Sequence, residues 1–253
     1  PSLWLGMNSY GLHLANLADA QGIDLAAGSV KKILCTAEPM TSSKREKLAR
    51  SWGAEVYDTF GMTECTMLGA ESPAHEGFHV WTDLAFIEVV DPATGKQVAE
   101  GEVGTLVVTS LYTNNSTPFL RWNSGDQVIY RSQGAHDGPF SVFPLLRHTN
   151  RTTGFFKVRG VNLNHSEFED FMFRDARVND FKVEAANDGG NDILRVYIEV
   201  KRGHNPNEAR DAVAAAVRAT FEVSPEMSVL ETGALAKEFE NSVKAPRFVD
   251  RRS

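Results

Sequence analysis

The stretch KILCTAEPMTSSKREKLARSWGAEVYDTFGMTE, from Lys32 to Glu64, decides the fold that we expect for this chain. The apolar run at 32–36 predicts a short buried strand, and residues 54–57 predict a second strand that delivers the residues after it into a loop. Between them, residues 42–52 indicate an amphipathic helix capped by Ser42 or Ser43. Its solvent-facing side is expected to carry Lys44, Arg45, Lys47 and Arg50. Strand, helix and strand at this spacing predict a parallel βαβ unit.

The segments on either side of this unit extend the prediction. Residues 10–22 have apolar positions at helical spacing and end in Gly22, which is typical of a helix and its stop. From 78 to 130 the pattern changes to short apolar or alternating runs separated by turn clusters, as expected for a β-rich part in the form of a distorted barrel. The runs are 86–90, 104–109 and 126–130.

A second change of pattern near Arg151 indicates a small domain with helices on one face of a sheet. Ser166 to Glu169 has the form of a capping box at the start of a helix that reaches about Phe173. A hairpin is predicted across the turn at 187–190, a helix after Asn205, and a last strand at 227–230. We therefore expect a mixed α/β and α+β fold. Its domains are 1–151 and 154–253, with a hinge at 151–154.

Composition limits the classes of function. The 253 residues are 42% hydrophobic, and 26 basic against 33 acidic residues give a net charge of -7. This balance argues against a nucleic-acid or anionic-membrane partner. No apolar stretch approaches the roughly 20 residues that span a bilayer, and the first residues lack the charged start of a signal peptide. With only two cysteines, a reducing compartment is indicated, so we expect a cytoplasmic protein.

The two cysteines have ordinary interpretations. Cys35 lies in an apolar run and is predicted to be a small buried hydrophobe. Cys65 is followed by His75 and His79, but a zinc site needs about four ligands and these three lack regular spacing. We therefore expect loop residues there.

Two groups of residues could carry chemistry at the strand ends. Phe60 to Glu64 combines an aromatic ring, a glycine, a hydroxyl and a carboxylate, where open α/β sheets bind ligands. The alternative is a tight turn with solvated polar residues. Asp126 follows a Ser-Gly turn, and its carboxylate could accept hydrogen bonds from ribose hydroxyls. The alternative is a turn aspartate that satisfies its own backbone.

Two further motifs lie in the last hundred residues. The run RTTGFFKVRGVN, Arg151 to Asn162, contains an Arg159-Gly160 pair whose simplest interpretation is a β-turn with an exposed arginine. Lys244 lies in the basic tail NSVKAPRFVDRR, 241–252, which has few core features. A lysine in such a tail is usually a solvated surface charge.

Taken together and in this order, the four motifs resemble the second half of an adenylate-forming acyl-CoA ligase of the phenylacetate-CoA ligase type. The resemblance implies that Phe60 stacks on adenine, Thr63 touches the α-phosphate and Glu64 binds Mg²⁺. It also implies that Lys244 reaches the carboxylate and α-phosphate during adenylation. Further nucleotide and thiol contacts implied by it fall on Ala37, Glu38, Pro39, Gly61, Asp126, Arg151, Arg159 and Gly160.

The chain departs from the family pattern at three positions. Phe60 stands where the family usually has tyrosine, and Thr36 replaces the glycine of its Gly-Ala-Glu-Pro turn. Thr153 stands where the family usually has the aspartate or lysine of its hinge. The Gly/Ser/Thr-rich phosphate loop that such enzymes carry upstream is not found before Tyr57. We therefore expect the carboxy-terminal part of a ligase.

The implied reaction joins a small carboxylic acid, aromatic or arylacetic, to coenzyme A at the expense of ATP with Mg²⁺. Two alternatives stay open: an adenylating enzyme with an amine or a carrier-protein thiol as acceptor, and a non-catalytic nucleotide-binding module. The sequence also leaves the identity of the acid and the oligomeric state open, including a homodimer.

Overall fold

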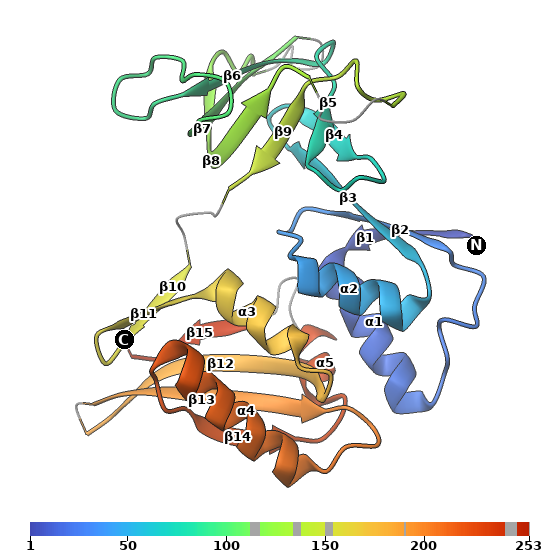
Figure 1. Ribbon diagram of the computed structural model, residues 1–253, viewed down its shortest axis with the longest axis vertical. Coiled ribbons are helices and arrows are strands. Elements are labelled where there is room, and N and C mark those ends of the chain that lie inside the picture. The colour runs from blue at the N-terminus through green and yellow to red at the C-terminus, as the bar shows by residue number, and fades with distance from the viewer. Residues whose placement is uncertain (112–116, 134–137, 150–153, 190, 241–246, 253) are drawn as a thin grey trace. The chain divides into compact units, whose positions relative to one another are not determined.

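The structure, a computed structural model, describes residues 1–111, 117–133, 138–149, 154–189, 191–240 and 247–252 (Figure 1). The chain divides into two compact units. The first unit contains Pro1–Met7, Lys31–Pro39 and Glu55–Thr153, and the second contains Asn8–Val30, Met40–Ala54 and Gly154–Ser253. This division differs from the domain limits 1–151 and 154–253, which stay a prediction together with the hinge at 151–154.

The first unit is built on one nine-stranded sheet with the strand order β1-β2-β3-β4-β5-β9-β8-β7-β6. Strands β1, β2 and β3 are parallel, and every later pairing is antiparallel. The parallel βαβ unit predicted from the sequence is therefore confirmed. The strands are β1 Leu3–Met7, β2 Lys32–Thr36, β3 Glu55–Met62, β4 Thr66–Glu71, β5 Phe78–Val80, β6 Ala85–Val90, β7 Val103–Ser110, β8 Trp122–Arg131 and β9 Leu145–His148.

Two expectations about this sheet were wrong. Strand β3 does not end at Tyr57 but runs to Met62, because its second half pairs antiparallel with β4. The motif 57–64 is therefore mostly strand. The later strands also do not form a separate barrel, since the β3–β4 pairing joins them to the parallel part. Within the described residues, β6 pairs with β7 and no pairing joins it back to β1.

The core of the first unit lies under the antiparallel strands. It includes Leu68, Leu106, Val128 and Leu146, each with 0% exposure. Cys65 belongs to the same cluster with 0% exposure, and it lies in the turn before β4, so its interpretation as a loop residue is confirmed. Cys35 is fully buried, as predicted.

The second unit contains a four-stranded sheet with the order β14-β13-β12-β15 and a two-stranded β10–β11 hairpin. The predicted hairpin at 187–190 is confirmed as β12–β13, and Asn205 caps α4 as expected. Strand β15 lies in the tail that we expected to have few core features, and it pairs parallel with β12. The elements are β10 Phe155–Val158, β11 Val161–Asn164, β12 Val178–Asp188, β13 Asn191–Val200, β14 Glu226–Leu230, β15 Phe248–Asp250, α1 Asn8–Gln21, α2 Ser42–Trp52, α3 His165–Arg174, α4 Pro206–Phe221 and α5 Ala234–Glu240.

Both predicted serine caps are displaced by one or two residues. Helix α2 is capped by Thr41, whose side chain accepts a hydrogen bond from the Lys44 N–H, and not by Ser42 or Ser43. Helix α3 is capped by Asn164, whose Oδ1 accepts from the backbone of Ser166 and Glu167. The capping box at Ser166 is therefore wrong. In both cases the residue just before the first helical turn has the extended backbone that a cap requires.

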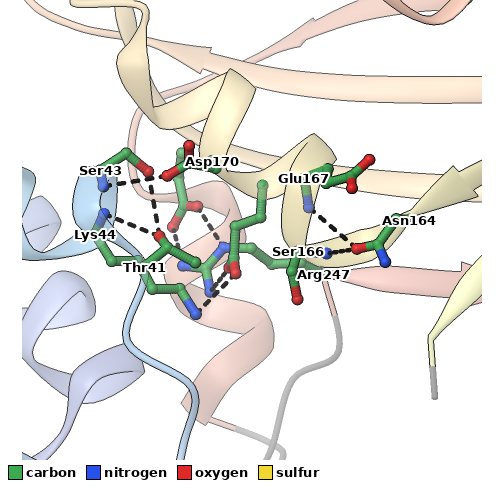
Figure 2. A network of polar contacts seen from close by, with 10 residues as sticks. Thr41, Ser43, Lys44, Asn164, Ser166, Glu167, Asp170 and Arg247 are labelled. Atoms are coloured by element: carbon green, nitrogen blue, oxygen red, sulfur yellow. Dashed lines mark hydrogen bonds and ion pairs between the residues drawn. The ribbon is translucent and has the colours of Figure 1, made fainter. Parts of the chain in front are cut away.

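A buried polar network connects α2 to α3, β12 and the segment before β15 (Figure 2). The Lys44 ammonium lies 2.8 Å from the Glu169 carboxylate, with side-chain exposures of 7% and 12%. Arg247 Nε donates to Asp180 Oδ1 at 3.1 Å, and its guanidinium also lies 3.7 Å from Glu169. Asn16 of α1 donates to the same Asp180 at 2.8 Å.

This network corrects the expected orientation of α2. Lys44 and Lys47 are both 6% exposed, whereas the prediction placed them on the solvent-facing side. Lys44 is buried because it pairs with Glu169, and the Lys47 ammonium lies 4.6 Å from the centroid of the Phe173 ring. Burial lowers the pKa of Lys47 to about 8. A charged side chain can thus face the protein interior when its partner is distant in the sequence.

Candidate functional site

The carboxyl ends of β2 and β3 lie side by side in the first unit. Thr36 pairs with Thr59, so the segment 37–39 leaves β2 next to Phe60. Ala37 takes a left-handed backbone conformation with φ 68°, which turns the chain sharply at the end of the strand. Such an edge of parallel strands is where open α/β sheets bind ligands.

The β3–β4 hairpin presents the polar residues of the first motif. Thr63 is exposed and Glu64 half-buried in the turn between Met62 and Thr66. Gly61 lies at an irregularity in the pairing, where a Cβ atom would come 2.7 Å from the Thr66 carbonyl oxygen. The close approach of the two strands therefore requires glycine at this position.

Three buried polar residues that the sequence analysis missed hold this region together. The Thr59 hydroxyl donates to the Cys35 carbonyl at 2.9 Å and so connects β3 to β2. Asp58 Oδ1 accepts from the Thr59 N–H at 2.9 Å, while the Asp58 N–H donates to the Glu71 carboxylate at 2.8 Å. The signal in the sequence that could have indicated these contacts is Asp58, an aspartate inside an otherwise strand-like run.

The Phe60 ring is part of an aromatic cluster. Its centroid lies 4.4 Å from the His148 ring in an edge-to-face arrangement and 5.6 Å from the Phe78 ring. The ring is partly buried and packs against the core of the first unit. His148 was not among the predicted site residues, because nothing local to β9 distinguishes it.

Asp126 lies within β8 and is 5% exposed, so it is a strand residue and not a turn residue. Its N–H donates to the Ser124 hydroxyl at 3.1 Å, across Gly125, which has φ 75°. Side chains two residues apart on a strand share a face, so Asp126 shares a face with Val128 and with the pairing partner of Val128, His148. Phe60 contacts that histidine, and both predicted residues therefore lie on one face of the sheet.

The Arg159-Gly160 pair forms the two-residue turn between β10 and β11 in the second unit. Both residues have positive φ, 49° and 85°, as a two-residue hairpin turn demands. Arg159 Nε donates to the Asp192 carbonyl at 2.9 Å. The predicted β-turn is thus present, and the thiol contact stays a prediction.

Two predicted residues fall outside the described part of the chain. Lys244 lies in 241–246, and Arg151 lies in 150–153 together with Thr153. Their roles therefore stay predictions.

The structure offers one carboxylate of the first motif for a metal ion. In the described ranges, no group of three or more His, Cys, Asp or Glu side chains is arranged to hold a metal. Mg²⁺ in nucleotide sites is usually bound by one or two carboxylates together with substrate phosphates. Glu64, half-buried in the hairpin turn, fits that kind of site.

Comparison with known proteins adds independent information. A family described as AMP-binding enzyme matches residues 1–113. The chain is 28% identical over 264 residues to a phenylacetate-coenzyme A ligase of Aromatoleum evansii, covering 100% of this chain and 58% of that protein. It is 31% identical over 166 residues to a phenylacetate-coenzyme A ligase of Thermus thermophilus, covering 64% of this chain and 36% of that protein. An indoleacetate–lysine synthetase of Pseudomonas savastanoi is 26% identical over 133 residues, covering 51% and 30%.

The fold is shared with solved ligase structures. A 2-hydroxyisobutyryl-CoA ligase in the postadenylation state, in complex with R3-HIB-AMP, matches with a TM-score of 0.79 and 24% identity. That match covers 100% of this chain and 55% of the other. The chain thus spans about half the length of the relatives it matches.

The chain is thus similar to the AMP-binding enzymes over residues 1–113. Phenylacetate-coenzyme A ligases are its distant homologues, with similarity along its whole length. In the described part of the chain, no helix is both long and apolar enough to cross a membrane.

Proposed function

We propose that this chain takes part in the ATP-dependent ligation of a carboxylic acid to coenzyme A through an acyl-adenylate. One observation carries the proposal: Asp126 and the Phe60–His148 pair share a sheet face beside the parallel strand ends. An aromatic ring and a buried carboxylate on one face suit a nucleoside, since the ring can stack on a base while the carboxylate accepts hydrogen bonds from ribose hydroxyls.

The proposed reaction has two steps. In the first, a carboxylate oxygen attacks the α-phosphorus of ATP, and pyrophosphate leaves. In the second, the thiol sulfur of coenzyme A attacks the acyl carbon, AMP leaves, and the thiol proton is released. We assign to Thr63 a contact with the α-phosphate. We assign to Lys244 the stabilisation of the negative charge that builds up between the acid and the α-phosphorus. Mg²⁺ held by Glu64 would neutralise phosphate charge, as metal ions do in phosphoryl chemistry.

The acid is proposed to be aromatic or arylacetic, because the relatives along the whole chain are phenylacetate-coenzyme A ligases. Ala37, Glu38 and Pro39 would line the adenine, with Gly61 allowing close backbone approach. Arg151 would contact ribose or phosphate, and Arg159 with Gly160 would contact coenzyme A.

A second candidate function is transfer of the acyl group to an amine. The 26% identity to an indoleacetate–lysine synthetase favours it. The two candidates share the first step and differ only in the nucleophile of the second.

The test begins with binding. Calorimetry on the 253-residue chain should detect AMP and, more tightly, a non-hydrolysable phenylacetyl-adenylate analogue, because transition-state and intermediate analogues gather more contacts than a product. Asp126→Asn and Phe60→Ala should each weaken both. If neither ligand bound, or if both variants bound as well as the wild type, the assigned site would be wrong.

Turnover then separates the candidates. ATP–pyrophosphate exchange with a panel of aromatic acids reports the first step, and product analysis with coenzyme A, lysine and a carrier protein reports the acceptor. Lys244→Ala should suppress exchange by about 10²- to 10³-fold, the usual loss for an electrostatic stabiliser. Nucleotide binding without exchange would favour the non-catalytic nucleotide-binding module.

A further inference from the structure

The first unit has a cavity of about 330 Å³ that the proposed function does not use. Its volume falls in the range of about 300–1,000 Å³ that small-molecule pockets occupy. It is lined by His75, Glu76, Ile129, Arg131, Leu145 and Arg147.

Strand register places the lining residues of β8 and β9 on one face. Ile129 pairs with Arg147, and Arg131 pairs with Leu145. Because side chains alternate along a strand, this face is opposite to the one that carries Asp126 and His148. The cavity is therefore separate from the proposed nucleotide site.

The two arginines are suitably placed to share one ligand. They occupy diagonal positions of an antiparallel pair, which usually lie about 7–8 Å apart and within reach of long side chains. Both arginines are exposed residues on this face. Glu76 supplies one carboxylate to the lining against these two cations. Like charges at such positions repel each other, and an anion between them would relieve the repulsion.

A fixed loop forms the wall of the cavity beside β9. Gly77 has φ 140°, and a Cβ atom there would lie 2.6 Å from the Leu146 carbonyl oxygen. His75 takes a left-handed conformation with φ 53° and lies 3.2 Å from the Glu71 carboxylate. Non-glycine residues in this conformation persist only where their surroundings hold them, and they gather at ligand sites. The wall is therefore preformed.

The cavity also offers an apolar surface. Leu145 is 5% exposed and Ile129 is half-buried. A hydrated free anion would gain little from these side chains, whereas an anion attached to an apolar group would bury area against them.

We propose that this cavity binds a small molecule with a single oxyanion, a phosphate or a carboxylate, attached to an apolar body. Arg131 and Arg147 hold the oxyanion, and Ile129 and Leu145 contact the apolar body. Planar guanidinium groups suit both kinds of oxyanion because each can donate two parallel hydrogen bonds.

The test uses the 253-residue chain at low salt with saturating AMP, so that the nucleotide site does not contribute. Phenyl phosphate and benzoate are the probes, and benzyl alcohol is the neutral control. We expect at least one probe to bind and benzyl alcohol to bind far more weakly. Arg131→Gln and Arg147→Gln should each weaken binding by about 10- to 100-fold, as the loss of a charged hydrogen bond does. The control Arg218→Gln, an exposed position on α4, should leave binding unchanged.

Each outcome decides the proposal. Tighter binding of phenyl phosphate would identify a phosphate site, and tighter binding of benzoate a carboxylate site. No binding of either probe to the folded protein would overturn the proposal, as would equal affinities for the two arginine variants and the control. Binding that is seen without AMP and is lost with saturating AMP would show that the probe occupies the nucleotide site instead, which would also overturn the proposal.

Discussion

Replacing Arg247 by methionine should strongly destabilise the second unit. The Arg247 side chain is 8% exposed and Asp180 only 3%, and Nε and Oδ1 are 3.1 Å apart. Methionine preserves much of the volume but removes the charge that compensates Asp180. Breaking a buried ion pair by removing one partner typically costs about 3–5 kcal/mol, because it leaves an uncompensated buried charge.

The remaining partners of Asp180 place the expected loss at the lower end of that range. Asn16 Nδ2 still donates to Oδ2 at 2.8 Å, and the Phe181 N–H donates to Oδ1 at 2.8 Å. Glu169 keeps Lys44 at 2.8 Å. We therefore expect a loss of about 3 kcal/mol in the free energy of unfolding. For a protein of this size, this corresponds to a decrease in Tm of roughly 6–12 °C.

Urea unfolding followed by circular dichroism measures this loss, and a double-mutant cycle tests its cause. Asp180→Asn removes the uncompensated charge, so Arg247→Met should cost much less in that background, with a coupling of at least about 1 kcal/mol. Arg251→Met is the control, since Arg251 is 60% exposed in its ion pair with Glu184. Exposed pairs contribute about 0–1 kcal/mol. If Arg247→Met cost no more than Arg251→Met, the buried network would not stabilise the unit as argued.

Three further predictions follow from single positions. Burial lowers the pKa of Lys47 to about 8 from 10.5, so between these values the unfolded chain binds the extra proton and stability rises with pH. The destabilisation is complete below about pH 8, so Lys47→Met should stabilise the protein at neutral pH by at most about 3 kcal/mol. In urea unfolding, the same substitution should remove the rise of the unfolding free energy with pH between about pH 8 and pH 10.5. Gly61→Ala should destabilise the first unit by about 1–3 kcal/mol through overpacking, because its Cβ would lie 2.7 Å from the Thr66 carbonyl; an unchanged urea midpoint would contradict the close approach. Asp126→Asn should weaken AMP binding by about tenfold in calorimetry, as expected when a charged acceptor becomes neutral, with no loss in Asp211→Asn, an exposed position on α4.

Local patterns predicted the elements whose formation depends on neighbouring residues. The strand 32–36 and the helix 42–52 have the bounds expected from apolar spacing, and Asn205 followed by Pro206 marked the start of α4. The predicted caps differ from the observed ones by one or two positions. Thr41, Ser42 and Ser43 are all good cap residues, and only the backbone conformation distinguishes them.

Features that depend on distant partners could not be predicted. The second half of β3 contains a glycine and a threonine, and it is a strand because β4 pairs with it. Lys44 is buried because Glu169 lies opposite it, 125 positions later in the sequence. The sequence pattern of α2 does not indicate that partner. Two of its four basic residues, Lys44 and Lys47, were therefore predicted on the solvent-facing side although they are buried.

The candidate site shows the same division between local and distant information. Phe60 and Asp126 were proposed from their motifs, and register places them on one sheet face. His148, which links them, has no motif of its own, and its place follows only from the pairing of β8 with β9. The roles of Lys244 and Arg151 stay predictions because both lie outside the described residues.

The β8–β9 pair gives both proposals a common physical basis. One face carries Asp126 and His148, and the other carries Arg131 and Arg147. Because the side-chain period of a strand is two, a slip of one residue in this pairing would exchange the two faces and destroy both sites together. Substitutions at Arg131 or Arg147 change only exposed side chains and leave the register intact. The two sites should therefore respond independently to those substitutions and together to any change that shifts β8 along β9.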